Sequence, residues 1–345
     1  MSQTSPDAPL SPGRDFEWRA RNIGYLLTAA TDRCVRDKLR VVHKSGFDEV
    51  SEAQLALFHN LGTGGDRLTT VAARAGMTKQ SMIELVDKSE ALALVERLPE
   101  AGDRRAKIIG FTPCGLLLLS AIHRGVDYAE RRMAQVVGTD FLEVLRSQLA
   151  CYGLGREAAN CALVGDDDLS WRTNNIGRIL SLAARRFVRD VLTDVHGRGN
   201  RDVTEVMLPL LRNLALEGSR LTEIASRARV TKQSMREMVD RVEMIGLIER
   251  GPDPTDRRAK CIMFTARGLD LLDEMRRGVT YAESRFRNTT GPDFTDELRS
   301  RLGAYGRGQP IDADHGSDHA TATVVDVPSA ALNPTSIPRA VRATR

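Results

Sequence analysis

The sequence predicts a mainly α-helical chain with small β-hairpins, divided into two similar domains. At 345 residues, the chain is long enough for about two domains of ordinary size. The segment that starts at Trp18 recurs from Trp171 onward at a constant offset of 153 positions, and 70 of the 138 aligned positions are identical without a gap. Within both copies the apolar residues recur mainly at helical spacing. Because the period is too long for a solenoid, each copy is expected to fold as its own unit.

The composition excludes several classes of protein. Hydrophobic residues make up 41% and charged residues 28% of the chain, as in an ordinary globular protein. The formal net charge of +4 is too small to indicate a nucleic-acid partner by itself. The first fifteen residues lack the apolar core of a secretory signal, and the apolar run at 116–119 is far too short to cross a bilayer. Five cysteines without a CxxC pair predict neither a disulfide framework nor a zinc site, so a reducing cytoplasm is the expected location.

The repeat sets the domain boundaries. A tail rich in Pro, Ser and Asp precedes it, an Asp-rich linker joins the copies, and a region without periodicity follows it. The predicted divisions are a disordered tail at 1–15, a first domain at 16–155, a linker at 156–170, a second domain at 171–308 and a disordered tail at 309–345.

Each copy is predicted to contain four helices, then a β-hairpin, then two further helices. Apolar periodicity marks the helices, and a turn between two short β-prone segments marks the hairpin. In the first copy the expected elements are a long helix starting at Ile23, a helix ending at the turn over 62–65, two short helices within 68–87, strands at 94–98 and 106–111, a long helix from Pro113 to about 135, and a helix over about 140–152.

Residues 68–87 have the spacing of a helix-turn-helix. Thr69 is expected to cap its first helix, and Thr78 its second. Gly76 lies where the turn needs a left-handed backbone. The second copy has Arg229 at that position, and a non-glycine residue in this conformation costs on the order of 1 kcal/mol.

The outer face of the second of these helices is a candidate DNA-reading surface, because a helix-turn-helix inserts this end into the major groove. Arginine can bind guanine, and glutamine adenine, through two hydrogen bonds. A solvated helix face is the simpler interpretation of one such segment alone. The candidate DNA-binding residues are Thr78, Lys79, Gln80 and Ser81 in the first copy and Thr231, Lys232, Gln233, Ser234 and Arg236 in the second.

The hairpin turn strengthens this interpretation. Asp256 and Arg258 are two positions apart, so they lie on one side of an extended chain and can pair across the loop. Arg257 then projects to the other side, where an arginine can enter a narrow minor groove. A plain surface ion pair, worth about 0–1 kcal/mol, is the alternative. The first copy repeats the pattern as Asp103, Arg104 and Arg105, which makes a winged helix-turn-helix that binds DNA the favoured prediction.

Two runs, at 230–272 and 77–119, resemble the MarR family of bacterial winged-helix transcriptional regulators. The most specific part is the Asp-x-Arg wing followed by Phe264-Thr265 and Gly268. The resemblance implies a cytoplasmic, nucleoid-associated regulator, most often a repressor, that binds a double-stranded DNA operator as a dimer built from the first and last helices. Many members release DNA when a small, often aromatic or phenolic, molecule binds between the dimer helices and the DNA-binding lobe. With both copies in one chain, we expect an intramolecular pseudo-dimer, while a higher oligomer stays open.

The copies differ at positions that matter for this resemblance. Ile83 is the counterpart of Arg236 in the second copy, so the first copy lacks an exposed basic residue that could contact a base at this position. Ser89 replaces an apolar core residue, and Ala93 replaces a glycine that the family usually has. Counting Lys and Arg against Asp and Glu gives +3 for residues 18–155 and +7 for residues 171–308. The second copy is therefore expected to be the stronger DNA binder.

Other chemistries have weaker support. His43 and His196 occupy equivalent positions near the region that the resemblance associates with ligands, although capping a helix is the commoner role of such a histidine. Cys34 is expected to be a packed, inert thiol, since its counterpart is Phe187. No nucleophile elbow or P-loop occurs, so no enzyme and no cofactor or metal is expected. Two alternatives stay open: a winged-helix module that binds proteins, and a nucleoid-type protein that coats DNA without sequence preference.

Overall fold

The computed structural model describes residues 18–19, 21–100, 103–155, 170–252 and 260–307. The predicted tails at 1–15 and 309–345, nearly all of the linker at 156–170 and the tip of the second hairpin lie outside these residues. No helix in the described part of the chain combines the length and hydropathy that a membrane span requires.

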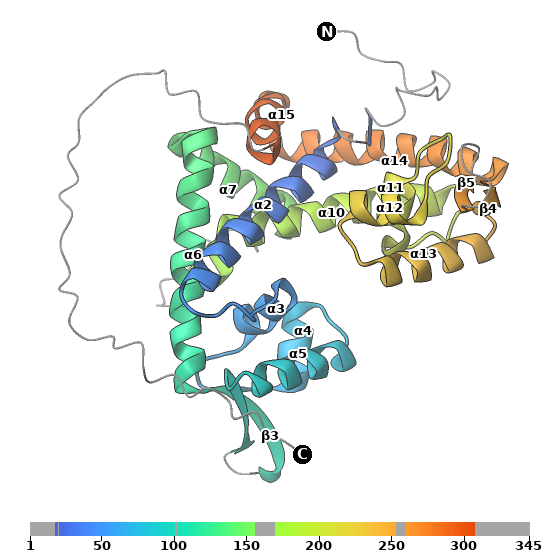
Figure 1. Cartoon of the computed structure of the whole chain (residues 1–345). Coiled ribbons are helices and arrows are strands. Elements are labelled where there is room, and N and C mark those ends of the chain that lie inside the picture. Colours follow the sequence, from blue (N-terminus) through green and yellow to red (C-terminus); the bar gives the residue numbers. More distant parts are fainter. Residues whose placement is uncertain (1–17, 20, 101–102, 156–169, 253–259, 308–345) are drawn as a thin grey trace. The chain divides into compact units, whose positions relative to one another are not determined.

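The first copy has the predicted order of four helices, a hairpin and two helices (Figure 1). Its elements are α2 (Ile23–Lys44), α3 (Glu52–Asn60), β1 (Asp66–Arg67), α4 (Leu68–Ala75), α5 (Lys79–Ala91), β2 (Val95–Glu100), β3 (Asp103–Phe111), α6 (Pro113–Val137) and α7 (Thr139–Leu154). The two-residue strand β1 was not predicted. It pairs antiparallel with β3 on the side opposite β2, so the sheet order is β1-β3-β2.

The second copy follows the same order with two local differences. Its elements are α9 (Ser170–Asn174), α10 (Ile176–Gly197), η1 (Glu205–Met207), α11 (Leu208–Asn213), α12 (Leu221–Ala228), α13 (Lys232–Met244), β4 (Ile248–Pro252), β5 (Lys260–Phe264), α14 (Ala266–Thr290) and α15 (Pro292–Arg307). The second helix is split into a 3-10 turn and the short α11, where Pro209 lies in the first turn. Where the first copy has a third strand, the described part of the second copy has one bridge, between Ser219 and Ile262.

The helix starts agree with the sequence at some positions and differ at others. Thr78 and Thr231 cap α5 and α13 as predicted, each accepting a hydrogen bond from a backbone N–H three residues later. The prediction that Thr69 caps α4 was wrong. Helix α4 starts at Leu68 with Arg67 as its N-cap, because β1 pairing holds Arg67 extended up to the first helical residue.

The helices of the two copies pack on one another. Helix α2 contacts α10, and the last helix of each copy packs on the first helix of the other, α7 on α10 and α15 on α2 (Figure 1). Their apolar stripes share one buried cluster that includes Ile23, Leu27, Ile179 and Leu180. The half of the first copy that contains α3, α4 and α5 has a separate core around Phe58 and Met82. Burial of the first helices therefore depends on both halves of the repeat.

Matched polar contacts join the same surfaces. The Glu283 carboxylate accepts a hydrogen bond from the backbone N–H of Ile23 at 3.1 Å, and the Glu130 carboxylate accepts one from Ile176 at 2.8 Å. Each glutamate also pairs with an arginine of its own copy, Arg299 at 2.7 Å and Arg146 at 3.1 Å. Equivalent glutamates thus make equivalent contacts, one from the second copy to the first and one from the first copy to the second.

Candidate nucleic-acid interface

Helix α13 separates its residues into a buried and an exposed face. Met235, Met238, Val239 and Val242 are buried against the lobe. The hydroxyl of Thr231 accepts from the Ser234 N–H at 3.1 Å and lies 2.8 Å from the Ser234 hydroxyl, which fixes the start of the helix. The predicted DNA-binding residues Thr231, Lys232, Gln233, Ser234 and Arg236 are all exposed.

Helix α5 of the first copy has the same geometry at its start. The Thr78 hydroxyl accepts from the Ser81 N–H at 3.1 Å, and Thr78, Lys79 and Gln80 are exposed while Ser81 is half-buried. Ile83, at the position of Arg236, is half-buried. The two helices therefore present the same first turn, but only α13 carries a cation on its second turn.

The acidic residues of each helix are bound by an arginine of the hairpin. Arg250 of β4 forms ion pairs with Asp240 and Glu243 of α13. Arg97 of β2 forms the same pairs with Asp87 and Glu90 of α5. These pairs, which the sequence interpretation missed, offset the negative charge on the helix and hold the hairpin against it. The signal was available, because the arginine and both carboxylates recur at the same offset in the second copy.

Gln233, one of the residues predicted to contact a base, already forms a hydrogen bond within the chain. The Gln233 amide donates to the Glu237 carboxylate at 2.9 Å, one turn further along α13. Binding of adenine by Gln233 would need this bond to be exchanged. Arg236 forms no hydrogen bond or ion pair with any of the described residues, so its guanidinium is available without such an exchange.

The wings are only partly described. Strand β3 begins at Asp103 and includes Arg104 and Arg105, and β2 and β3 pair with a register shift near Pro99. Glu100, at the end of β2, pairs with Arg67 at 2.6 Å. Asp256, Arg257 and Arg258 lie outside the described residues, so the predicted Asp–Arg wing pairs stay predictions.

Backbone conformation confirms the strained turn of the second copy. Gly76 and Arg229 both have left-handed conformations, with φ of 65° and 55°. Ala93 and Gly246, at the turn before the hairpin, form a second such pair, with φ of 55° and 74°. Among the described residues, each copy therefore carries one non-glycine residue in a region of backbone space that favours glycine.

The polar residue Ser89 in the first core is explained by a partner. Ser89 is fully buried, and its hydroxyl accepts a hydrogen bond from the Gln54 amide at 3.1 Å. The second copy has Val242 and Met207 at the two equivalent positions. An apolar pair in one copy is thus replaced by a hydrogen-bonded pair in the other, which satisfies both buried groups.

The candidate ligand histidines have equivalent contacts. His43 Nε2 lies 2.9 Å from the carbonyl oxygen of Val50, and His196 Nε2 lies 2.7 Å from that of Val203. Both contacts join the end of a long first helix to the segment that follows it. Cys34 is buried, its Sγ lies 3.5 Å from the Tyr305 hydroxyl, and burial raises its pKa to about 11, as expected for an unreactive thiol.

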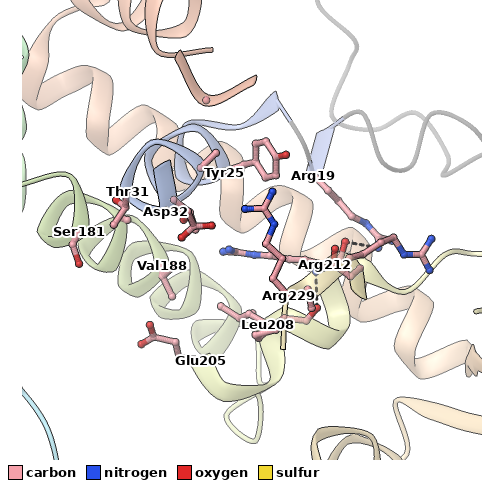
Figure 2. Close-up of a pocket in the computed structure, with 18 of the residues that line it drawn as sticks. Arg19, Tyr25, Thr31, Asp32, Ser181, Val188, Glu205, Leu208, Arg212 and Arg229 are labelled. Atoms are coloured by element: carbon pink, nitrogen blue, oxygen red, sulfur yellow. Dashed lines mark hydrogen bonds between the residues drawn. The ribbon is translucent and has the colours of Figure 1, made fainter. Parts of the chain in front are cut away.

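A cavity lies between the first helices of the two copies, α2 and α10, and the helices α11 and α12 of the second copy (Figure 2). Its volume is about 560 Å³. Tyr25 and Asp32 line it from α2, Val188 from α10, Leu208 and Arg212 from α11, and Arg229 from the turn before α13. Neither His43 nor His196 lines it. Among the described residues, no group of three or more metal-ligating side chains occurs.

Comparison with known proteins identifies one segment. Residues 208–260 match the model of the MarR family, so this part of the second copy, from α11 to the first residue of β5, is a MarR family domain. No curated protein matches the chain.

Two solved structures are similar over part of the chain. One is CouR from Rhodococcus jostii RHA1 bound to p-coumaroyl-CoA, with 24% identity and a TM-score of 0.33, covering 40% of this chain and 96% of that one. The other is the transcriptional repressor CouR bound to a 23-mer DNA duplex, with 28% identity and a TM-score of 0.32, covering 41% of this chain and 98% of that one.

Proposed function

We propose that the chain is a transcriptional regulator, acting as a repressor, that binds a double-stranded DNA operator through the amino-terminal face of α13. The observation that carries this proposal is the exposure of Thr231, Lys232 and Arg236 on a capped helix within the MarR family segment. The helix amino terminus and backbone amides can hold a phosphate, and Arg236 can read a guanine. Arg257 adds a wing contact in the minor groove, while Arg258 pairs with Asp256 and holds the loop at the DNA.

We further propose that one chain supplies both DNA-binding lobes as a pseudo-dimer. The packing of α2 on α10, together with the matched contacts of Glu130 and Glu283, supports this arrangement. Tethering gives each lobe a high effective concentration for the other. The two lobes then read adjacent major grooves, and the difference between Ile83 and Arg236 makes the operator asymmetric.

Release of DNA by a small ligand is the third part of the proposal. The cavity beside α11 and α12 supports it, because a ligand there touches both the helices that join the copies and the lobe that carries α13. Its volume of about 560 Å³ is that of an ordinary small-molecule site.

The deciding experiment selects genomic DNA fragments with the full chain and measures affinity for the selected duplex and for its scrambled version. We expect the selected site to bind at least about 10³-fold more tightly at physiological salt. Equal affinities would indicate a nucleoid-type protein. The absence of binding to either duplex would indicate a protein-interaction module.

Sedimentation of the same protein at micromolar concentration tests the assembly. A pseudo-dimer is expected to sediment as one chain of 38.0 kDa. A species of about twice that mass, with no monomer on dilution, would show that the helices associate between chains.

A further inference from the structure

We propose that the two lobes read base pairs of opposite composition. The first lobe reads A·T pairs, with Ile83 on the 5-methyl group of thymine and Gln80 on adenine, and the second lobe reads a G·C pair through Arg236. This inference rests on the proposed function, since it names the bases that the two halves of the operator present. It can be contradicted separately, because a chain whose lobes prefer the same bases would still be a sequence-specific regulator.

Helices α5 and α13 begin in the same way and bind their hairpins in the same way. In each helix the capping threonine accepts a hydrogen bond from the backbone N–H three residues later, at 3.1 Å. In each lobe one hairpin arginine, Arg97 or Arg250, pairs with two carboxylates on one flank of the helix. Equivalent positions of the two helices therefore have equivalent places in their lobes, and a difference in base preference has to come from the side chains.

Ile83 is an apolar side chain that its own core does not use. It is half-buried, and among the described residues it belongs neither to the core cluster around Phe58 and Met82 nor to the partly buried apolar residues packed against that cluster. It lies one helical turn from Lys79 and from Asp87, which are both exposed. The apolar group that the major groove offers to such a side chain is the thymine methyl group.

The glutamine one turn before Ile83 is also free to bind a base. In the second lobe Gln233 donates to Glu237 at 2.9 Å, so it has to give up this bond before it can bind adenine. The amide of Gln80 forms no hydrogen bond with any described residue, and it is exposed. A glutamine amide can bind the N6 and N7 atoms of adenine through two hydrogen bonds. Gln80 can make this contact without an exchange.

Gln80 and Ile83 are close enough to meet the same base pair or neighbouring ones. They are three residues apart on α5, so their Cβ atoms lie about 5–6 Å apart on one side of the helix. Successive base pairs are separated by about 3.4 Å along the duplex. An adenine bound by Gln80 and a thymine methyl group bound by Ile83 therefore belong to one A·T pair or to two adjacent ones.

The second lobe offers the opposite combination of groups. Its glutamine is bound to Glu237, and the guanidinium of Arg236 forms no hydrogen bond or ion pair with any described residue. A guanidinium binds the O6 and N7 atoms of guanine. The group available without an exchange is thus a guanidinium in the second lobe, and an amide beside an aliphatic side chain in the first.

The first test measures binding of the full chain to the selected operator by fluorescence anisotropy, with each thymine replaced in turn by uracil. This replacement removes only the 5-methyl group. At one thymine we expect a loss of affinity of about three- to fivefold, as for one buried methyl group. The loss should disappear in Ile83→Ser, which identifies the thymine that Ile83 contacts. Lys88→Ser, in the last turn of α5, is the control and should leave the loss unchanged.

Exchanging the two side chains tests the opposite preferences directly. Ile83→Arg is expected to change the preferred pair at that position from T·A to G·C, and Arg236→Ile to make the reverse change in the other half of the operator. Each change should alter the ratio of the two affinities by about 5–100-fold. Gln80→Ala should weaken operator binding by about 5–100-fold, and Gln233→Ala by less.

A duplex with 5-methylcytosine paired to guanine at the identified thymine separates the two sources of a methyl group. It should bind more weakly than the thymine duplex, because Gln80 loses its adenine. Equal or tighter binding would overturn the assignment to A·T pairs.

The inference is also overturned if no uracil effect depends on Ile83, if Ile83→Arg keeps the original base preference, or if Gln80→Ala and Gln233→Ala have equal effects. All variants are expected to keep the melting temperature of the wild type, and a large loss in Ile83→Ser would show that Ile83 packs the lobe instead. A chain that selects no operator fails in its proposed function, whereas these outcomes on a selected operator contradict this inference alone.

Discussion

Arg19 and Arg172 make the same contacts in opposite copies of the repeat. Arg19 precedes α2 and donates to the carbonyl oxygens of Leu211 and Leu214 in the second copy, at 3.1 and 2.8 Å. Arg172 lies in α9 and donates to the carbonyl oxygens of Phe58 and Leu61 in the first copy. Both arginines are buried, and in each case the acceptors lie at the carboxyl end of the helix that precedes the helix-turn-helix. Each copy thus supplies an arginine whose guanidinium donates hydrogen bonds to carbonyl groups at the end of a helix in the other copy.

The first prediction concerns this exchange. Arg172→Met should lower the free energy of unfolding by about 2–4 kcal/mol, because two carbonyls at the end of α3 lose buried, charge-assisted hydrogen bonds. Urea unfolding of the full chain measures the change. Arg201→Met is the control, because Arg201 is exposed and pairs with none of the described residues. Equal stability of the two variants would contradict the role of Arg172.

The second prediction tests the packing of α2 on α10. A Cβ added at Gly24 would lie 2.4 Å from the ring of Phe187, whereas one at the equivalent Gly177 would lie 3.4 Å from Cys34 Cβ. Gly24→Ala should therefore destabilise the chain by about 1–3 kcal/mol through overpacking. Gly177→Ala should be neutral or gain up to about 1 kcal/mol from helix propensity. Thermal unfolding compares them, and equal melting temperatures would argue against this packing in solution.

The third prediction concerns base reading by α13. Arg236→Ala should weaken operator binding by about 1–3 kcal/mol and relax the preference at one base pair. Arg241→Ala, in the last turn of the same helix, removes the same charge far from the amino-terminal end and should have little effect. Fluorescence anisotropy with the selected operator and its single-base variants is the measurement. Unchanged affinity and base preference in Arg236→Ala would remove Arg236 from the interface.

The fourth prediction concerns the wings. Arg257→Ala, and to a smaller degree Arg104→Ala, should weaken binding to many sequences and reduce the slope of log affinity against log salt by about one. Titrations between low and physiological salt give this slope. A slope equal to that of the wild type would mean that the wing arginines do not contact DNA.

The fifth prediction uses the buried Lys38. Burial lowers its pKa to about 8 from 10.5, so between these pH values the unfolded chain binds a proton that the folded chain lacks, and the stability of the wild type rises with pH. Lys38→Met should be more stable than the wild type at pH 7, by on the order of 2–3 kcal/mol, and this difference should shrink as the pH approaches 10. Urea unfolding at pH 7 to 10 measures it. Parallel curves would refute the prediction, and Lys44→Met, an exposed residue at the end of the same helix, is the control.

The elements of this fold are predictable from local patterns, whereas many of its contacts are not. Helix ranges, the caps at Thr78 and Thr231 and the left-handed Arg229 follow from spacing within a few residues. The hydrogen bond of Gln54 to Ser89 joins residues that are 35 positions apart, so no local pattern predicts it. The pairs of Arg250 with Asp240 and Glu243 span only 10 and 7 positions, but they depend on how the hairpin folds against α13. The start of α4 was misplaced because β1 is only two residues long and depends on pairing with β3.

The candidate site divides in the same way. The exposed face of α13 is predictable from the sequence, because a cap and a stripe of buried residues define it locally. The cavity is not predictable in this way, because its walls come from helices of both copies and its arginines are scattered through the sequence. The repeat itself contains a usable signal, because Arg229, which replaces the uncharged Gly76 of the first copy, lines this cavity.

The exchange of last helices between the copies has a consequence for synthesis of the protein. The first copy leaves the ribosome before α10 and α15 exist, so the apolar stripes of α2 and α7 stay uncovered while roughly half of the chain is still being translated. A nascent first copy is therefore incompletely buried, however well its own lobe folds. Until α10 emerges, these exposed apolar stripes can bind chaperones or cause aggregation. The packing around α2 is completed last, when α15 emerges.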